Sequence, residues 1–387
     1  MRVLHVMPWF YPAMVYGGPA QSVYDLARAT SRDGCEVRVL TTNANGSSNL
    51  NVQCASDTDL EEGVVVRYCR RWFGDSVSPQ LFWRLAGEIK RADIVHLGLT
   101  YSFPVIPTLL LCRMFRKPVV WSPRGGLQRY QHSRRRLLKA AWELVCRLIA
   151  PRSTVLHVTG EEEARESRRR IPRGCVVVPN GVDVPREISH APGNALRLMY
   201  LGRLHPKKGI ENLLQACALL PANLDWSLDV IGAGDEEYET KLRQKIAETQ
   251  IQERVHMRGM LLGEEKARAF ENCDLAVFPS YTENFGLVVA EALSHGVPVI
   301  TSKGMPWSRV EKVGCGAWID NDPESIAAAI SRMSSMPLRE MGERGREWMR
   351  REFSWDDAAT KLITVYRELI ANSGRNALEI QPGSVRA

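Results

Sequence analysis

Short runs of Val, Ile and Leu recur along the whole chain, each followed by a loop and a stretch with helical periodicity. The expected strands of the first half are residues 2–7, 36–41, 64–68, 94–97, 119–122, 155–158 and 175–178. Those of the second half are residues 196–201, 227–231, 255–258, 275–278, 297–301 and 317–319. Apolar runs of this kind, separated by helices, predict parallel sheets that are covered on both faces. Each series is long enough for one doubly wound α/β domain.

A break between the two series lies near residues 179–194, where Asn180-Gly181 is a turn signal and further Pro and Gly residues predict a linker. The 387 residues are also enough for two domains of ordinary size. We therefore predict an amino-terminal domain at residues 1–183 and a carboxyl-terminal domain at residues 184–355. A helix at residues 356–371 and a flexible tail at residues 372–387 are expected to follow.

Charge is distributed unevenly between the two halves. Residues 1–183 contain 26 Lys and Arg against 16 Asp and Glu, whereas the rest of the chain is slightly acidic. A basic first half suggests an anionic partner, such as a membrane surface, a phosphorylated lipid or nucleic acid. None of the nine cysteines falls in a Cys-x-x-Cys pair. This pattern argues against a disulfide framework or a zinc site and favours the cytoplasm.

A basic loop follows the first strand of the second series, with the sequence Gly202-Arg203-Leu204-His205-Pro206-Lys207-Lys208-Gly209. Gly202 lets the backbone approach a diphosphate, and Arg203 and Lys208 can neutralise its charge. The loop follows the carboxyl end of a strand, where α/β sheets bind ligands. Taken alone, it could equally be a basic surface loop.

The block from Pro279 to Glu291 follows the strand at 275–278. We expect a helix to begin near Phe285-Gly286, so that its positive end can bind a phosphate. Glu283 lies just before this helix and Glu291 lies about two turns into it. Two carboxylates so placed can hold one hydroxyl on a sugar ring and one on a ribose.

The dipeptide Gly17-Gly18 lies in the loop after the first strand of the chain, before an expected helix at 21–29. A glycine pair there lets the backbone approach a ligand from the opposite wall. A plain turn is the alternative.

Together these residues resemble the retaining glycosyltransferases of family 4, from Gly17-Gly18 to Phe353-Ser354-Trp355. The spacing of Glu283 and Glu291 matches the E-x7-E motif of that family. The resemblance implies the GT-B architecture, in which two Rossmann-like, doubly wound parallel-sheet domains face each other across a cleft. It also implies that the helix at 356–371 crosses back onto the first domain.

The resemblance implies a role for each matching residue. Arg203 and Lys208 would bind the diphosphate of a nucleotide-sugar donor, Glu291 the ribose and Glu283 the transferred sugar. Catalytic roles are implied for Arg203, Lys208 and Glu283, and the chemistry of arginine adds Arg124 to the catalytic candidates. Donor-binding roles are implied for Gly17, Gly18, Gly202, Gly259, Met260, Asn284, Phe285, Gly286, Leu287 and Glu291, with Gly259 and Met260 meeting the nucleobase.

One departure from the family pattern concerns Arg124, which stands in Trp121-Ser122-Pro123-Arg124 where many members carry a histidine facing the donor sugar. Arginine cannot act as a base at neutral pH, but it can stabilise a phosphate or a sugar hydroxyl. The alternative is that Arg124 only faces solvent. We expect front-side displacement with the side-chain cations stabilising the leaving phosphate. No metal ion and no cofactor are expected, and the nucleotide sugar is a substrate.

The acceptor is expected to be a saccharide or a lipid-linked saccharide. Residues 128–152 predict a basic amphipathic helix suited to an anionic membrane surface, which would make this cytoplasmic protein peripheral on the inner face of the membrane. In the alternative, the apolar stripe of this helix enters the core and its arginines face water.

Three other functions compete with this hypothesis. A sugar-nucleotide epimerase of the same fold is compatible with the same residues. Ile231-Gly232-Ala233-Gly234-Asp235 suggests a nicotinamide dehydrogenase, but Glu237 stands where the third glycine of that fingerprint would be. A non-catalytic binder of nucleic acid or another anionic surface would explain the basic half, but no nucleic-acid-binding module is recognisable, so nucleic acid is not expected as a partner.

Overall fold

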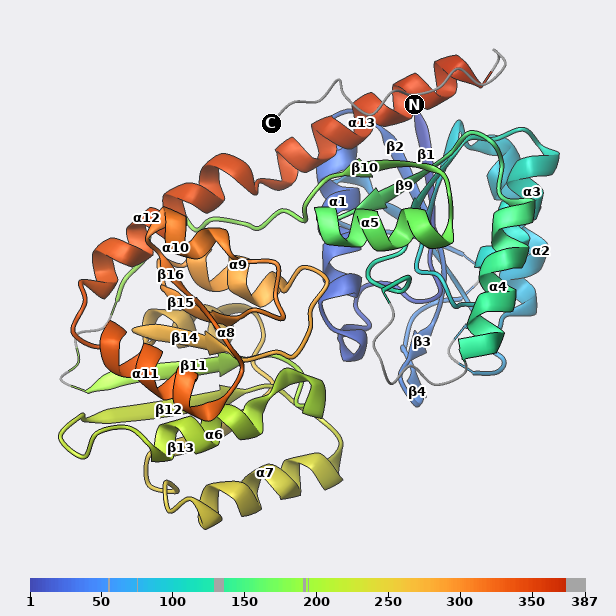
Figure 1. Cartoon of the computed structure of the whole chain (residues 1–387). Helices are drawn as coiled ribbons and strands as arrows, with labels where there is room; N and C mark the ends of the chain where they lie inside the picture. Colours follow the sequence, from blue (N-terminus) through green and yellow to red (C-terminus); the bar gives the residue numbers. More distant parts are fainter. Residues whose placement is uncertain (55, 75, 129–135, 191–192, 194, 374–387) are drawn as a thin grey trace. The chain divides into compact units, whose positions relative to one another are not determined.

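The computed structural model describes residues 1–373, apart from residues 55, 75, 129–135, 191–192 and 194 (Figure 1). The chain divides into two compact units. Unit 1 comprises Met1–Gly181 together with Trp355–Ala387, and unit 2 comprises Val182–Ser354. The helix predicted at 356–371 is α13 (Trp355–Asn372), and it belongs to unit 1. The tail predicted at 372–387 lies, from residue 374 onward, outside the described residues.

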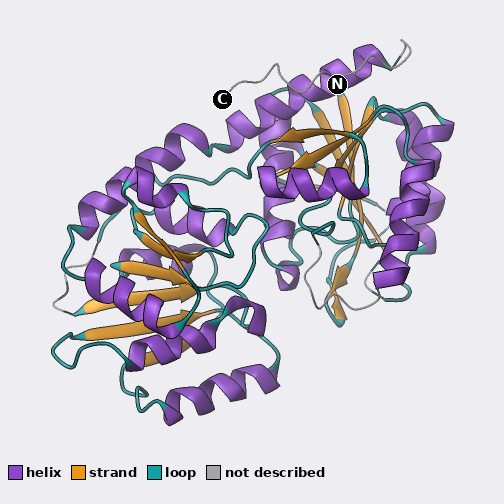
Figure 2. Cartoon of the chain, viewed as in Figure 1, coloured by secondary structure: helices purple, strands orange, loops and turns teal. Residues whose placement is uncertain are grey.

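Unit 1 is built on a sheet with the strand order β10-β9-β8-β7-β1-β2-β6-β5, in which every pair but the last is parallel. The strands are β1 (Arg2–Val6), β2 (Glu36–Thr42), β5 (Asp57–Asp59), β6 (Val65–Cys69), β7 (Ile94–Gly98), β8 (Val119–Ser122), β9 (Thr154–Val158) and β10 (Gly174–Val177). The helices that cover it are α1 (Gly18–Arg32), α2 (Pro79–Arg91), α3 (Val105–Met114), α4 (Arg136–Ile149), α5 (Glu161–Arg170) and α13 (Figure 2). The short strands β3 (Ala44–Asn45), β4 (Ser48–Asn49) and β5 were not predicted, because two or three residues are too few to show the alternation typical of a strand.

Helix α13 packs against α1 and seals one face of the sheet of unit 1. Its buried side chains, among them Leu362, Ile363 and Tyr366, share a core cluster with residues of β1 and β2. A Cβ at Gly181 would collide with the backbone of Trp355, so glycine is required where the two segments of unit 1 meet. Burial of this apolar face explains why α13 joins unit 1 although it follows unit 2 in sequence.

Unit 2 contains a six-stranded parallel sheet in the order β13-β12-β11-β14-β15-β16. The strands are β11 (Leu196–Leu201), β12 (Trp226–Ile231), β13 (Val255–Gly259), β14 (Leu275–Phe278), β15 (Val299–Ser302) and β16 (Gly316–Ile319). The helices are α6 (Ile210–Ala218), α7 (Glu236–Glu248), α8 (Gly263–Glu271), α9 (Leu287–Ser294), α10 (Arg309–Val313), α11 (Pro323–Met333) and α12 (Leu338–Glu352). The order reverses between β11 and β14, and ligands of doubly wound sheets bind at this switch point.

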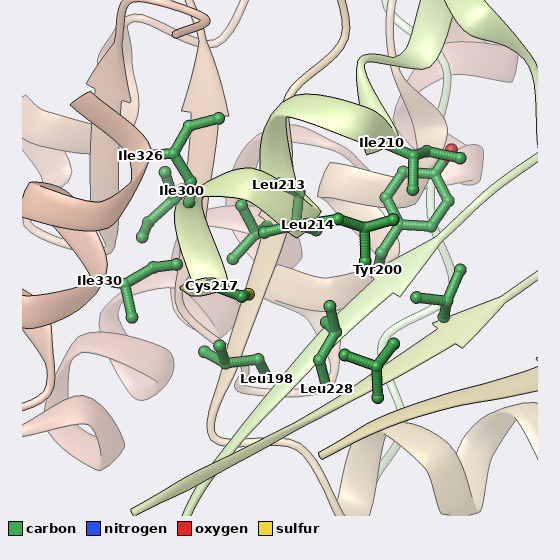
Figure 3. Close-up of a cluster of buried hydrophobic side chains, with 14 of the residues drawn as sticks. Leu198, Tyr200, Ile210, Leu213, Leu214, Cys217, Leu228, Ile300, Ile326 and Ile330 are labelled. Atoms are coloured by element: carbon green, nitrogen blue, oxygen red, sulfur yellow. The ribbon is translucent and has the colours of Figure 1, made fainter. Parts of the chain in front are cut away.

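Aliphatic side chains fill the space between the sheet of unit 2 and the helices α6 and α11 (Figure 3). Leu213 and Leu214 of α6 pack there with Ile326 and Ile330 of α11, and all four are buried. This packing anchors the strands whose ends carry the two predicted donor loops. The prediction of two Rossmann-like parallel-sheet domains is confirmed. Among the described residues, no helix is long and apolar enough to cross a membrane.

Candidate active site

The loop at residues 202–209 leaves β11 at the switch point of unit 2. The Gly202 amide donates to the Ile231 carbonyl at 3.0 Å, and the Arg203 side chain is exposed. Gly209 has a φ of +66°, and a Cβ there would collide with the Pro279 carbonyl. Gly209 therefore lets this loop lie directly against the loop that follows β14.

The loop at residues 279–286 is held by backbone and amide hydrogen bonds from three neighbouring segments. The Tyr281 amide donates to the Lys207 carbonyl at 2.9 Å, and the Glu283 amide donates to the Gly304 carbonyl at 3.0 Å. The Asn321 side chain donates to the Pro279 carbonyl at 2.5 Å. The two predicted donor loops therefore form one fixed surface at the carboxyl ends of β11 and β14.

Lys208 and Glu283 form an ion pair on this surface, which brings two of the predicted catalytic residues into contact. Both side chains are largely buried, with 19% and 16% of their surface exposed. The Ser280 hydroxyl donates to the same Glu283 oxygen at 3.4 Å. A diphosphate can compete with Glu283 for the Lys208 ammonium, which would release the carboxylate to bind a sugar hydroxyl.

Helix α9 begins at Leu287, and Gly286 caps it in the left-handed conformation, with a φ of 78°. This start lies where the sequence predicted it. The Phe285 side chain packs against Trp307 and Phe353, and its carbonyl accepts a hydrogen bond from the Trp307 indole at 2.5 Å. The Phe285 side chain is therefore part of the core, so only its backbone is available to a ligand.

Glu291 of α9 forms an ion pair with Lys266 of α8 at 2.6 Å. Lys266 was missed by the sequence analysis, since nothing in its own segment distinguishes it from a surface lysine. Only the packing of α8 beside the second carboxylate of the E-x7-E motif reveals it. Glu283 and Glu291 thus form ion pairs with two different lysines, Lys208 and Lys266.

The predicted nucleobase segment, Gly259 and Met260, lies at the end of β13, which is an outer strand separated from β11 by β12. The Gly259 carbonyl accepts a hydrogen bond from the Gly232 amide at 2.8 Å, and the Met260 side chain is half exposed. Side chains at Gly232 or Gly234 would collide with the carbonyls of residues 202 and 204. Close packing of the 202–209 loop therefore explains the glycines that suggested a dehydrogenase.

In unit 1, the Gly17-Gly18 pair opens α1, and Gly17 has a φ of 75°. No atom lies within 4 Å of a Cβ built at Gly17, so its positive φ rather than crowding favours glycine there. Ser22, one turn further along α1, accepts a hydrogen bond from the Arg124 guanidinium at 2.9 Å. The structure thus places the glycine pair and Arg124 at the same edge of unit 1.

The Arg124 side chain turns inward rather than standing in solvent, so the solvent-facing alternative is wrong. Its guanidinium also donates to the Asn180 side chain at 3.3 Å, and its Nε is buried without a partner. Burial lowers the pKa of the guanidinium to about 10, which leaves it charged at neutral pH. Glu163 fixes the adjacent backbone by accepting hydrogen bonds from the amides of Gly125 at 2.6 Å and Thr159 at 2.8 Å.

A chain of buried polar side chains lies beneath Arg124. His96 bridges the Tyr366 hydroxyl at 2.5 Å and the Ser122 hydroxyl at 2.6 Å, and Ser122 bonds His157 at 2.7 Å. His5 stacks on His96 with ring centroids 4.8 Å apart. Burial, followed by the nearby Arg124 charge, lowers the pKa of His5 and of His157 to about 3. These imidazoles are therefore neutral near pH 7.

A pocket of about 230 Å³ opens at the carboxyl ends of β1, β7 and β8. It is lined by Pro8, Trp9, Ser76, Leu99, Thr100, Tyr101, Ser102, Pro123, Arg124 and Gly126. The hydroxyls of Thr100 and Ser102 are buried without a partner. Trp9 is buried and stacks on Tyr16, so hydroxyls and a guanidinium are the groups here that can bind a polyhydroxylated ligand.

Family models match both halves of the chain. The model described as "Glycosyltransferase Family 4" matches residues 16–186, and the model described as "Glycosyl transferases group 1" matches residues 183–348. The chain belongs to these glycosyltransferases. The prediction of the family and that of a transferase enzyme are confirmed.

Relatives of known activity and solved structures agree with this assignment. The "GDP-mannose:cellobiosyl-diphosphopolyprenol alpha-mannosyltransferase" of Xanthomonas oryzae pv. oryzae is 29% identical over 354 residues, which is 87% of this chain and 88% of the relative. A sucrose-phosphate synthase from Thermosynechococcus elongatus has a TM-score of 0.75 at 20% identity, covering 96% of this chain and 99% of the other. HepE from Anabaena, solved in complex with UDP and glucose, has a TM-score of 0.76 at 17% identity, covering 95% and 100%. These structures share the fold of the glycosyltransferase.

The glycosyltransferase thus carries its predicted site residues in two sets. Arg203, Lys208, Glu283 and the start of α9 lie on the two adjoining loops of unit 2, with Gly259 and Met260 at an outer strand. Gly17, Gly18 and Arg124 lie in unit 1. Within the described part of the chain, no group of three or more His, Cys, Asp and Glu side chains is placed to hold a metal ion.

Proposed function

We propose that this glycosyltransferase moves a hexose from a nucleotide sugar to a saccharide or lipid-linked saccharide in the synthesis of a cell-surface polysaccharide. The observation that carries the proposal is the Lys208–Glu283 pair at the switch point of unit 2. A cation for phosphate and a carboxylate for sugar hydroxyls are both needed to hold a nucleotide sugar. The name of the Xanthomonas relative supports GDP-mannose as the first donor to test. The ligands of the HepE structures support UDP-glucose as the second.

On the donor side, Lys208, Arg203 and the amides at the start of α9 would bind the diphosphate. Glu283 would bind the transferred sugar, and Glu291, held by Lys266, would bind the ribose. Gly202 and the backbone of residues 284–287 would approach the phosphates and the sugar, and Gly259 and Met260 the base. Gly17 and Gly18 would contribute backbone contacts from unit 1.

Transfer would proceed by front-side displacement with retention at the anomeric carbon. The bond from that carbon to the phosphate oxygen breaks, and its electron pair stays on the leaving diphosphate. The acceptor hydroxyl forms the new bond on the same face and gives its proton to the departing phosphate oxygen. Lys208, Arg203 and the positive end of α9 would stabilise the charge that develops there. Because side-chain cations supply this stabilisation, the proposed route needs neither a metal ion nor a cofactor.

On the acceptor side, the pocket beside Arg124 would take the saccharide, with Thr100 and Ser102 as hydrogen-bonding groups. Arg124 would stabilise a sugar hydroxyl or a phosphate. Residues 128–152 would contact the inner face of an anionic membrane, which makes the protein cytoplasmic and peripheral. Within that range, residues 129–135 lie outside the described residues.

The donor half of the proposal is tested by a thermal-shift panel with GDP, UDP, ADP and their sugar conjugates. A ligand that binds the folded state raises the melting temperature by mass action, so one base is expected to give a selective increase. Turnover should persist in excess EDTA; complete loss restored by manganese would contradict the metal-free route. Conversion of a nucleotide sugar to its epimer without any acceptor would instead favour the epimerase alternative.

A further inference from the structure

The segment that leaves β15 lies along the loop at residues 279–286 and bonds it at three points. The Ser302 hydroxyl and the Trp307 indole each donate a hydrogen bond to a carbonyl of this loop. Between them, the Gly304 carbonyl accepts from an amide of the loop at 3.0 Å. A Cβ at Gly304 would collide with the backbone of the loop, so glycine is required for this contact. The conformation of the loop thus depends on the segment after β15, in which the sequence analysis found no site residue.

Trp307 makes the last of these contacts from inside the core of unit 2. Its side chain is buried and packs on the rings of Phe285, Trp348 and Phe353, with centroids 5.3–5.7 Å away. An indole has a single hydrogen-bond donor, its N–H. In Trp307 this group donates to the Phe285 carbonyl at 2.5 Å. The carbonyl of Phe285 is therefore directed into the aromatic cluster.

The orientation of this carbonyl also fixes the amide of Gly286. Both groups belong to one planar trans peptide unit, in which the C=O and the N–H point in opposite directions. The Gly286 amide is therefore directed away from the aromatic cluster, and within the described residues it has no hydrogen-bond partner. Gly286 and Leu287 are only partly buried. The Gly286 amide thus joins the free amides at the start of α9, where the proposed donor site places a phosphate.

Glycine at position 286 does not fix this orientation by itself. Turning a peptide unit over changes the ψ of the residue before it and the φ of the residue after it. Gly286 has a φ of 78°, but glycine accepts either sign of φ. In the flipped peptide the Phe285 carbonyl oxygen would replace the Gly286 amide and would repel an anion. The hydrogen bond from Trp307 therefore selects the orientation that can bind a phosphate.

We propose that Trp307 is a positioning residue for the phosphate that carries the sugar, because its indole holds the Gly286 amide toward that phosphate. The inference deepens the proposed function and rests on it for the nucleotide sugar. Glu283, which is assigned to the transferred sugar, precedes Gly286 by only three residues. The phosphate that meets the Gly286 amide is accordingly the one next to the sugar, which is the terminal phosphate of a nucleoside diphosphate.

The test compares the binding of GDP with GMP, and of UDP with UMP, to the full chain by isothermal titration calorimetry. Trp307→Phe keeps an aromatic ring but removes the indole N–H. With the base that the parent prefers, the affinity for the diphosphate should fall about tenfold, whereas the affinity for the monophosphate should change little. The matched control is Trp348→Phe, which reduces a ring of the same cluster and leaves the bond from Trp307 to Phe285 in place. It should keep the diphosphate preference of the parent.

A second variant acts on the same peptide from its other end. Gly286→Ala disfavours a positive φ and so favours the flipped peptide, and it should also lose affinity for the diphosphate selectively. The nearest atom to the added methyl is the terminal carbon of the Met305 side chain, which is flexible. In the combined variant Trp307→Phe/Gly286→Ala the two losses should not add, because both act on one peptide.

Four outcomes would overturn this inference. They are an unchanged diphosphate preference in Trp307→Phe, an equal loss of both affinities, the same loss in Trp348→Phe, and additive losses in the combined variant. If Trp307→Phe does not fold, an unchanged preference in Gly286→Ala overturns the inference instead. A parent that binds neither GDP nor UDP would contradict the proposed function itself, whereas a parent that binds one of them allows this inference to fail alone.

Discussion

The two units carry their candidate functional groups in different ways. In unit 2, Lys208 and Glu283 come from two contiguous loops at the ends of neighbouring strands, and glycines such as Gly209 fix the contact between them. In unit 1, Arg124 depends on groups scattered over the chain, from Ser22 on α1 to Asn180. The proposed donor site is thus a local structure, whereas the proposed acceptor site is assembled by the tertiary fold.

This difference has a chemical counterpart. The groups of unit 2 are charged. Arg203 is exposed, and Lys208 and Glu283 each keep part of their surface accessible to a diphosphate. Those of unit 1 are buried and mostly neutral, because His5 and His157 have pKa values lowered to about 3 and surround a single guanidinium. We therefore expect substitutions in unit 2 to act on catalysis, and substitutions in unit 1 to act on both catalysis and stability.

The largest effect is expected for Lys208→Ala. It removes the cation assigned to the leaving phosphate, and loss of one such group lowers kcat by about 10²–10³-fold. The matched control is Lys303→Ala, which breaks an exposed pair with Asp320 at the end of β15 and should leave turnover near that of the parent. Steady-state kinetics with the donor found in the thermal-shift panel measures both. If the two variants had similar turnover rates, Lys208 would be no more important for catalysis than an exposed surface lysine, which would contradict its assigned role.

A smaller effect is expected for Arg124→Lys. The charge is kept, but the planar guanidinium whose Nη1 donates to both Ser22 and Asn180 is lost. We expect kcat/KM to fall by about 10–10²-fold. Arg116→Lys is the control, since Arg116 is exposed and shares the positive φ of Arg124. Unchanged kcat/KM in Arg124→Lys would assign Arg124 a purely structural role.

The sequence predicted most of what is local. The apolar runs predicted the strands, and the rule that ligands bind at strand ends placed Arg203, Lys208 and Glu283 on adjoining loops. Periodicity predicted an amphipathic helix within residues 128–152. It could not say which apolar residues of α4 enter the core. Cys146 does so, with Trp142 and Ile149 packed beside it, whereas Leu137 and Leu148 are exposed.

What the sequence did not predict depends on contacts between distant segments. His96 and Tyr366 are 270 residues apart, and neither lies in a recognisable motif. Lys266 becomes a candidate site residue only through its ion pair with Glu291, which the sequence does not show.

A pH effect on stability should be larger in unit 1 than in unit 2, where burial lowers the pKa values of His190, His205 and His295 less strongly. His5 and His157 stay neutral when folded but bind protons near pH 6.5 when unfolded, so the unfolded state gains protons as the pH falls. The free energy of unfolding of unit 1 should therefore fall between about pH 7 and pH 5.5, by up to about 2–3 kcal/mol for the two groups. Native-state hydrogen exchange, corrected for the intrinsic pH dependence, measures this in β1 and β9, with β12 of unit 2 as reference. An equal decline in both units would contradict the account.

The smallest effect is expected for Lys266→Met. Glu291 keeps its charge but loses the lysine that orients it, so the KM for the donor should rise by about 3–10-fold while kcat changes little. The control is Lys245→Met on α7, which breaks a partly exposed ion pair between Lys245 and Glu248. A fall in kcat with an unchanged KM would place Lys266 in the chemical step instead.

The most direct test of the central claim, that unit 2 binds the nucleotide sugar through its two adjoining loops, is hydrogen exchange of the full chain with and without saturating GDP or UDP. The account predicts slower exchange in peptides that cover residues 202–209 and 280–291. Peptides that cover residues 242–248, at the carboxyl end of α7, should be unchanged. Unchanged exchange in both loops, although the nucleotide raises the melting temperature, would show that the nucleotide binds elsewhere and would contradict the account.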